Sequence, residues 1–198
     1  CEALMSVAAA RLDALYQLGG SSGCDVPLTD AEGVVLDLRT SESDRAVFDS
    51  WGLTPGADWS EASEGTNGIG TCLAETRRVT IHRDEHFHAR NTAMSCMDAP
   101  IYGAEGEVVA ALDVSSARAD QTEWFKRLIA AMVAQTARQI ETDTFRASFP
   151  KARILVAEAP ETEAATLLAV DGDDIVIGAT RGARRAFGLL TAGPLSPV

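Results

Sequence analysis

Apolar side chains recur every three or four residues near the beginning of the chain and again after residue 120. The first run, from Glu2 to Leu18, and the second, from Gln121 to Ser148, each place these side chains on one side of a helix. The apolar side of the second run consists of Trp124, Phe125, Leu128, Ile129, Met132, Ile140 and Phe145. Pro150 cannot continue a helix, so the second run ends before it. The pattern therefore predicts two long amphipathic helices.

The apolar stretches between these helices are short and are bounded by turn residues, which is typical of strands. Strands are expected at 26–28, 34–38, 79–82, 94–101 and 108–115. Shorter helices are expected at 44–51 and 66–75. The fold class that follows is α+β, with a central antiparallel sheet and the long N- and C-terminal helices on one of its faces.

The tail of the chain departs from this pattern. Residues 150–166 form a linker rich in Ala, Glu and Pro, and two apolar runs with a basic helix follow between Leu167 and Phe187. This second unit is too short to bury a core alone. We therefore expect a main domain at 1–149, a linker at 150–166 and the incomplete beginning of another domain at 167–198.

The charge balance excludes one large class of functions. The chain has 29 acidic and 17 basic residues, a formal net charge of −12. Because such a chain repels phosphate, we expect no direct nucleic-acid binding by it. The one basic cluster, Arg181, Arg184 and Arg185, follows three aspartates closely, and we interpret it as the solvated face of a helix.

Hydropathy and cysteine usage limit the location. No apolar run approaches the roughly 20 residues that cross a bilayer, and the first residues are typical of an amphipathic helix and not of a signal peptide. The four cysteines, Cys1, Cys24, Cys72 and Cys96, form no CxxC pair. We expect reduced thiols, a cytoplasmic location and no membrane partner.

One stretch, Glu64 to Ser116, carries a recognisable set of motifs. They are Glu64-Gly65-Thr66-Asn67, Ile69-Gly70-Thr71, Glu85-His86-Phe87, Cys96-Met97-Asp98-Ala99-Pro100-Ile101 and Leu112-Asp113-Val114-Ser115. In this order and spacing they resemble a GAF sensory domain, and more narrowly the amino-terminal GAF domain of bacterial activators of acetoin and glycerol metabolism. The resemblance covers about Leu12 to Phe149, and the tail is similar to the beginning of a PAS domain.

The resemblance implies a regulatory role. In that family the sensor precedes an ATPase module that acts on RNA polymerase carrying sigma-N, and a Fis-type helix-turn-helix comes last. This sequence has no GxxxxGK[ST] phosphate loop, so by resemblance DNA binding belongs to a further, C-terminal part of the polypeptide. The implied function is signal sensing without catalysis or cofactor, by binding a small metabolite or a partner protein. Dimerisation through the first and last helices is also implied.

The candidate binding site lies on the sheet face that the segment from Trp59 to Asn91 covers. Apolar walls are expected from Trp59, Phe87 and Met94, and polar contacts from His86, Asn91, Cys96 and Asp113. Trp59 and Trp51 flank a Pro-Gly loop, and they either form a lid or fasten this loop to the core.

Three features have competing interpretations. In the glycine-rich segment Glu64–Gly70, Thr66 caps a helix that Gly68 and Gly70 allow close to the sheet, or the segment contacts a ligand directly. Asp113, inside an apolar strand, needs a partner, which is either Arg78 or Arg90 or a ligand hydroxyl. The apolar stripe of the last helix faces a second subunit or is buried within the monomer.

Histidines and cysteines offer two further alternatives. His82, His86 and His88 with Cys72 and Cys96 contain metal-ligand types, but their spacing fits no standard site, and we expect no metal. Cys96 could be a nucleophile with Cys72 as resolving thiol, as in GAF domains that reduce free methionine sulfoxide. The competing interpretation is that Cys96 is a buried, unreactive thiol.

Overall fold

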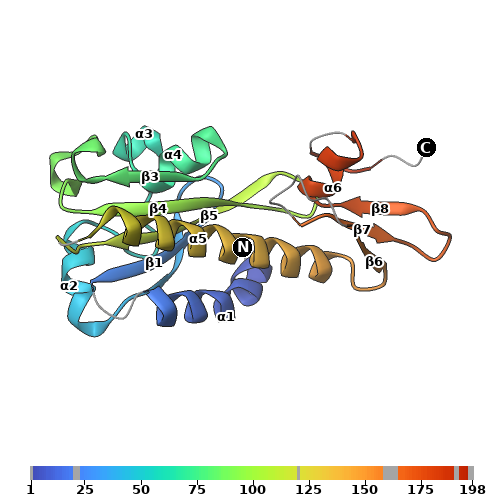
Figure 1. The fold of residues 1–198 in the computed structure, drawn as a ribbon, viewed down its shortest axis with the longest axis horizontal. Helices are drawn as coiled ribbons and strands as arrows, with labels where there is room; N and C mark the ends of the chain where they lie inside the picture. The colour runs from blue at the N-terminus through green and yellow to red at the C-terminus, as the bar shows by residue number, and fades with distance from the viewer. Residues whose placement is uncertain (1, 20–22, 120, 158–164, 190–191, 196–198) are drawn as a thin grey trace.

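The core of the protein is a five-stranded antiparallel sheet with helices on both faces (Figure 1). The computed structural model describes residues 2–19, 23–119, 121–157, 165–189 and 192–195. The strand order is β2-β1-β5-β4-β3. Its strands are β1 (Cys24–Thr29), β2 (Val35–Arg39), β3 (Val79–His82), β4 (Ser95–Tyr102) and β5 (Val108–Ser116). The expected combination of helices with an antiparallel sheet is confirmed.

One face of the sheet packs against the two longest helices, α1 (Glu2–Gly19) and α5 (Glu123–Ser148). Side chains alternate along a strand, so every second residue of β1, β4 and β5 faces these helices. Val26, Met97 and Leu112 are fully buried there against Leu12 and Ile140. Thr122 caps α5 by accepting a hydrogen bond from the Phe125 amide, and the helix begins at Glu123, two residues later than the apolar stripe predicts.

Short elements cover the opposite face. They are α2 (Glu42–Ser50), α3 (Glu61–Glu64), α4 (Gly68–Glu75) and the 3-10 turns η1 (Arg83–Glu85) and η2 (Ala89–Asn91). Phe48, Trp59 and Ile69 from these segments form a second apolar cluster with Val79 and Ala111 of the sheet. This face also carries the polar residues of the candidate site.

The cap of α4 differs from the expectation. The helix begins at Gly68, and the Asn67 side chain, not Thr66, accepts the hydrogen bond from the Gly70 amide. Gly65 has a φ of 61°, a left-handed conformation that glycine adopts without strain. The predicted entry turn at Gly65 is therefore present, but the capping residue is one position later.

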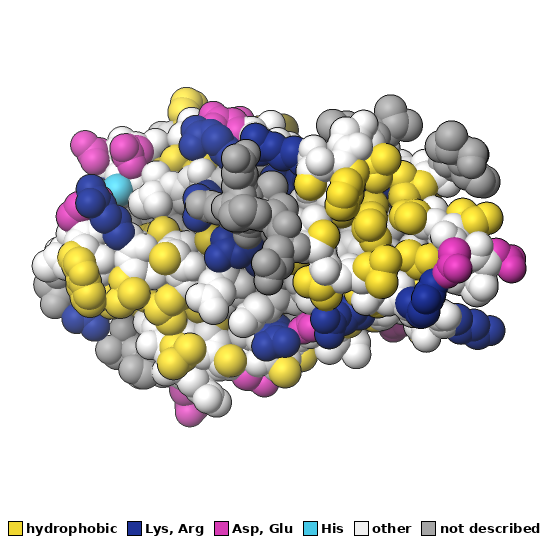
Figure 2. Space-filling view, turned by 45° about the vertical axis from the view of Figure 1, so that its right-hand side comes forward, with side chains coloured by type: hydrophobic (Ala, Val, Ile, Leu, Met, Phe, Trp, Pro, Cys, Tyr) yellow, Lys and Arg dark blue, Asp and Glu magenta, His cyan; other side chains and the backbone are white. Residues whose placement is uncertain are grey.

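A second, three-stranded sheet extends the molecule beyond the end of α5 (Figure 1). It consists of β6 (Arg153–Val156), β7 (Leu167–Val170) and β8 (Val176–Ala179), followed by α6 (Arg181–Ala186). Residues 153–156 of the expected linker thus form a strand paired with β7, whereas 158–164 lie outside the described residues, as does Cys1. Figure 2 shows apolar side chains gathered over this C-terminal unit, where Val156 and Phe187 are among the exposed ones.

The interpretation of the basic cluster is wrong for one of its arginines. Arg184 is only 2% exposed, and its guanidinium donates hydrogen bonds to the carbonyl oxygens of Ala179 and Gly193. Arg181 stacks on the ring of Tyr102 at 3.8 Å.

In the described part of the chain, no helix combines the length and apolar character that crossing a membrane requires.

Candidate functional site

Polar side chains form two adjacent rows across the sheet face below α4. In one row Ser115 of β5 lies between Asp25 of β1 and Cys96 of β4. In the next row Asp113 of β5 pairs with Asp98 of β4. All five side chains are buried. Residues two apart on a strand share a face, so the register alone places these groups together under the covering segment. We call the five residues the acid site.

A chain of hydrogen bonds joins the acid site to His86. The Ser115 hydroxyl donates to Oδ2 of Asp113 at 2.6 Å, and its oxygen lies 3.3 Å from Sγ of Cys96. Sγ of Cys96 in turn lies 3.5 Å from Nε2 of His86, whose Nδ1–H donates to the Arg83 carbonyl. Because Nδ1 carries the proton, Nε2 of the neutral ring is free to accept the Cys96 S–H.

Burial keeps this histidine neutral and favours protonated carboxyls. Burial lowers the pKa of His86, while it raises the pKa of Asp113 to about 7 and that of Asp25 to about 8. The pKa of Asp98 is raised well above its ordinary range by burial and by the charge of Asp113. Three carboxyls in one apolar setting cannot all be ionised, so the site holds protons at neutral pH.

Several polar atoms of this region have no hydrogen-bond partner among the described residues. They are Oδ2 of Asp25, both carboxyl oxygens of Asp98, Oδ1 of Asp113, and both the oxygen and the nitrogen of the Asn91 side-chain amide. Buried polar groups are nearly always paired, because a lost hydrogen bond costs about 1–3 kcal/mol. A protonated Asp98 can donate to Asp113, so the polar atoms that remain include donors and acceptors, and a bound molecule with hydroxyl or carbonyl groups would satisfy them.

The amino end of α4 lies directly on these carboxyls. A Cβ on Gly68 would lie 2.1 Å from Oδ2 of Asp98 and 2.5 Å from Cβ of Cys96. Glycine is therefore required for the closeness of the helix to β4. Access to the acid site requires that this covering segment move away from the sheet.

The thiols of Cys96 in the acid site and of Cys72 in α4 are poor nucleophiles. Burial, followed by the charges of Asp113 and Asp98, raises the pKa of Cys96 well above its ordinary value. Burial likewise raises the pKa of Cys72. Since the thiolate is the reactive form, both cysteines remain inert thiols at neutral pH. This chemistry favours the interpretation of Cys96 as a buried polar group over that of a catalytic residue.

The structure brings some of the expected binding residues together and separates one from them. His86, Cys96 and Asp113 are linked as described. Met94 belongs to the apolar cluster beside Cys96, together with Trp59, whose indole N–H donates to the Gly52 carbonyl. Trp59 thus fastens its loop to the core.

Phe87, in contrast, is 71% exposed and packs against Gly65, outside the site. Phe87 follows the buried His86 in an irregular segment and turns to the solvent. The motif alone did not indicate this. Arg90 also lies elsewhere, because it pairs with Glu64 at the surface. Asp113 therefore does not pair with Arg90, and it accepts a hydrogen bond from the Ser115 hydroxyl.

Sequence reasoning did not include Asp25, Asp98 and Ser115 among the binding residues. The signal that identified Asp113, a polar side chain inside a buried strand, applies equally to these three residues. The histidines do not converge: His82 contacts Ser95, and His88 lies 4.0 Å from Glu64. Among the described residues no group of three metal-binding side chains is arranged to hold an ion.

Comparison with known proteins gives a consistent pattern. The sequence profile of the GAF domain matches residues 5–142. The acetoin catabolism regulatory protein of Cupriavidus necator is 33% identical over 177 residues, which are 87% of this chain and 26% of that protein. The acetoin dehydrogenase operon transcriptional activator AcoR of Bacillus subtilis is 34% identical over 90 residues, 44% of this chain and 14% of AcoR.

A solved structure shares the fold. The crystal structure of the E. coli DhaR(N)–DhaL complex contains a chain that is 14% identical, with a TM-score of 0.65 over 100% of this chain and 68% of that chain. At this identity the likeness concerns the fold alone. The chain described here spans about a quarter of the length of the Cupriavidus regulator.

Proposed function

The chain belongs to the GAF domain family, and from this premise we propose that it is the signal-sensing part of a transcriptional activator whose acid site binds a small hydroxylated metabolite. Its relatives are transcriptional activators or regulators. The observation that carries the proposal is the set of unpartnered polar atoms on Asp98 and Asp113 beneath α4, with those of the buried Asn91 in η2, which covers the same face of the sheet.

The chemistry of these atoms selects the ligand class. Carboxyl groups in an apolar site exchange hydrogen bonds with hydroxyl groups, and any of them that ionises repels an anion. The Asn91 amide both donates and accepts, so it suits a carbonyl or a second hydroxyl. A short hydroxyketone such as acetoin combines one donor with one acceptor in an apolar frame, and two curated relatives are named for acetoin. This ligand would occupy the space that α4 vacates.

Transmission would follow from the shared sheet. Residues of β4 and β5 contact the acid site on one face and α5 on the other. A ligand that binds one arrangement of β4 more tightly shifts the population towards it and reorients α5. The PAS-like C-terminal unit that follows α5 would receive this change and pass it to further modules.

Binding calorimetry with four related compounds tests the proposal. Acetoin and 2,3-butanediol carry the hydroxyl, whereas 2-butanone lacks it and acetate adds a charge. We expect the first two to bind and the last two to fail. In Asp98→Asn and Asp113→Asn the affinity for acetoin should fall roughly fivefold to tenfold, because each lost hydrogen bond contributes about 1–1.5 kcal/mol.

The matched control is Asp173→Asn, which removes a carboxyl from an exposed turn of the C-terminal unit. It should bind acetoin like the unmodified chain. Failure of both hydroxylated compounds at millimolar concentration, or equal binding by the acid-site variants, would contradict the proposed site. Native mass spectrometry of the freshly purified protein would show whether a molecule of this class is retained.

Catalysis is not part of the proposal. The raised pKa values of Cys96 and Cys72 leave little thiolate for attack on a sulfoxide. Incubation with free methionine sulfoxide and a thiol reductant should therefore yield no methionine above background. Turnover that disappears in Cys96→Ser would reassign the protein as a reductase.

A further inference from the structure

A cavity rich in arginine lies on the opposite face of the sheet from the acid site. It has a volume of about 180 Å³, and residues from the end of α4, the strand β4, helix α5 and the first turn of α6 line it. The lining contains four arginines, Arg77, Arg78, Arg138 and Arg181, against one carboxyl, Glu141. In a chain with a net charge of −12 this is a local reversal of sign.

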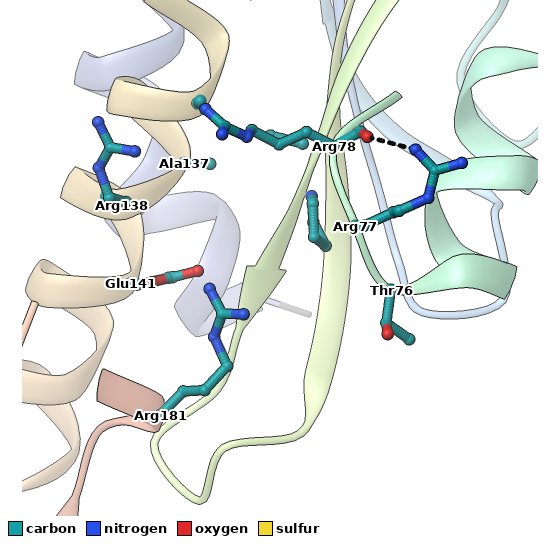
Figure 3. A pocket seen from close by; sticks show the side chains of 10 residues that line it. Thr76, Arg77, Arg78, Ala137, Arg138, Glu141 and Arg181 are labelled. Carbon is teal, nitrogen blue, oxygen red and sulfur yellow. Dashed lines mark hydrogen bonds between the residues drawn. The ribbon is translucent and has the colours of Figure 1, made fainter. Parts of the chain in front are cut away.

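The side chains approach the cavity from different elements (Figure 3). Arg78, the residue before β3, extends towards α5. Arg181 extends from α6 towards Glu141 of α5. Arg77 points away, since it donates to the Arg78 carbonyl and pairs with Glu75. Among the lining arginines, Arg138 and Arg181 therefore present the guanidinium groups that an anion between α5 and α6 would meet.

Glu141 cannot balance the guanidinium groups of both Arg138 and Arg181. One of its oxygens already accepts a hydrogen bond from the Tyr102 amide at 3.2 Å. Burial raises its pKa to about 7, although the charges of Arg181 and Arg138 act against this rise. At neutral pH it contributes one negative charge at most. Within the described residues, Arg138 forms no ion pair.

Arg181 is held in a geometry suited to anion binding. The carbon of its guanidinium lies 3.8 Å from the centre of the Tyr102 ring, and the Tyr102 hydroxyl is itself fixed by donating to the Thr76 carbonyl at 2.8 Å. This contact holds the guanidinium at the cavity. Planar N–H pairs bind carboxylate and phosphate groups in a bidentate way.

The floor of the cavity leaves room for such a group. Ala99, Ala134 and Ala137 line it with methyl groups in place of long side chains. Its volume equals about six water molecules at roughly 30 Å³ each. This space suits a phosphate group or a small di- or tricarboxylate.

We propose that the cavity between α5, β4 and α6 is a second binding site, which takes a small anion through Arg138 and Arg181. The ligand class is a compound with a phosphoryl group or several carboxylates. Because Arg181 belongs to the C-terminal unit and Arg138 to α5, a bound anion bridges the two parts of the chain. It is separate from the acid site, whose residues lie beneath α4 on the other face of β4.

Binding calorimetry on the whole chain tests this site. The affinities for inorganic phosphate and citrate are measured at constant ionic strength, with chloride as the control anion. We expect phosphate, citrate or both to bind, and chloride not to compete. The stronger of the two indicates whether the natural ligand presents a phosphoryl or carboxylate group. In Arg138→Gln the affinity should fall at least tenfold, and in the double variant with Arg181→Gln binding should disappear.

The matched control is Arg153→Gln, which removes an exposed arginine paired with Asp174 in the same C-terminal unit. It should bind the anion unchanged. If Arg181→Gln disturbs α6, Arg138→Gln alone decides the result, because its side chain is in no hydrogen bond or ion pair that holds the described fold. Absence of binding by both anions at millimolar concentration, or unchanged binding by Arg138→Gln, would overturn the proposal. Either result leaves the acetoin experiment unaffected.

Discussion

At the scale of single residues, Gly68 sets the distance between α4 and the acid site. In Gly68→Ala the new methyl group would overlap Asp98 and Cys96, so α4 must move outwards. We expect a loss of about 1–3 kcal/mol in the free energy of unfolding, the usual cost of overpacking. Urea denaturation followed by circular dichroism measures it. Gly172→Ala is the control, since a Cβ there meets no atom within 4 Å, and equal stability of both variants would contradict the packing described.

The buried carboxyls make stability depend on pH. Asp25, Asp113 and Glu141 have folded pKa values of about 8, 7 and 7, all above their unfolded values near 4. The folded state therefore binds more protons, and its free energy of unfolding falls as pH rises towards 8. Each additional proton contributes a slope of at most about 1.4 kcal/mol per pH unit.

Denaturation at several pH values between 6.5 and 8 measures this slope. The opposite effect of His86, whose pKa burial lowers, fades above pH 6.5, because the unfolded histidine, with a pKa near 6.5, then loses its proton as well. Asp98→Asn should flatten the slope, since it removes a carboxyl whose pKa is raised well above its ordinary range only in the folded state, and its matched control Asp173→Asn should not. Stability that increases from pH 6.5 to 8 would show that these carboxyls are not protonated in the folded state.

At the scale of elements, α5 presents apolar side chains that the monomer leaves uncovered. Trp124 is 71% and Leu128 42% exposed, while Met132 is partly buried against the core. We expect homodimerisation through α1 and α5, with Trp124 and Leu128 in the interface. Leu128→Glu should shift the protein from dimer to monomer in light scattering at micromolar concentration. Lys151→Glu, outside this strip, should leave the dimer intact.

Two outcomes distinguish the alternatives for this helix. A monomeric unmodified chain would contradict the dimer directly. A Leu128→Glu variant that unfolds, judged by circular dichroism, would assign the side chain to the core of the monomer. Because Leu128 is 42% exposed, we expect Leu128→Glu to remain folded and to change the free energy of unfolding only slightly.

The elements themselves were largely predictable, because their hydrophobic periods are clear. The strand at 79–82 agrees with β3 in both limits, and 108–115 is one residue shorter than β5. The site was less predictable. Phe87 and His86 are neighbours in sequence, yet only one is buried, since an irregular segment has no fixed period. Asp98 and Asp25 join Asp113 through strand register, which depends on pairing across the whole sheet.

At the scale of the whole molecule, charge opposes nucleic-acid binding. A net charge of −12 repels the DNA backbone. The basic residues near the end of the chain do not form one exposed basic surface, because Arg184 is buried against backbone carbonyls and Arg181 belongs to the lining of the small arginine cavity. An electrophoretic mobility assay at low salt should show no retention of duplex DNA by this chain. Retention that weakens with salt and is lost in Arg185→Glu would contradict this expectation.

Strand β4 separates the two proposed sites by the thickness of one sheet. Asp98 lies in the acid site, while its neighbour Ala99 lines the arginine cavity on the other face. A molecule that displaces this strand from one side changes the space available on the other. The metabolite then changes the affinity of the protein for the anion by a certain factor. Thermodynamic reciprocity requires that the anion change the affinity for the metabolite by the same factor. A single strand would thus make the protein respond to two chemical signals jointly.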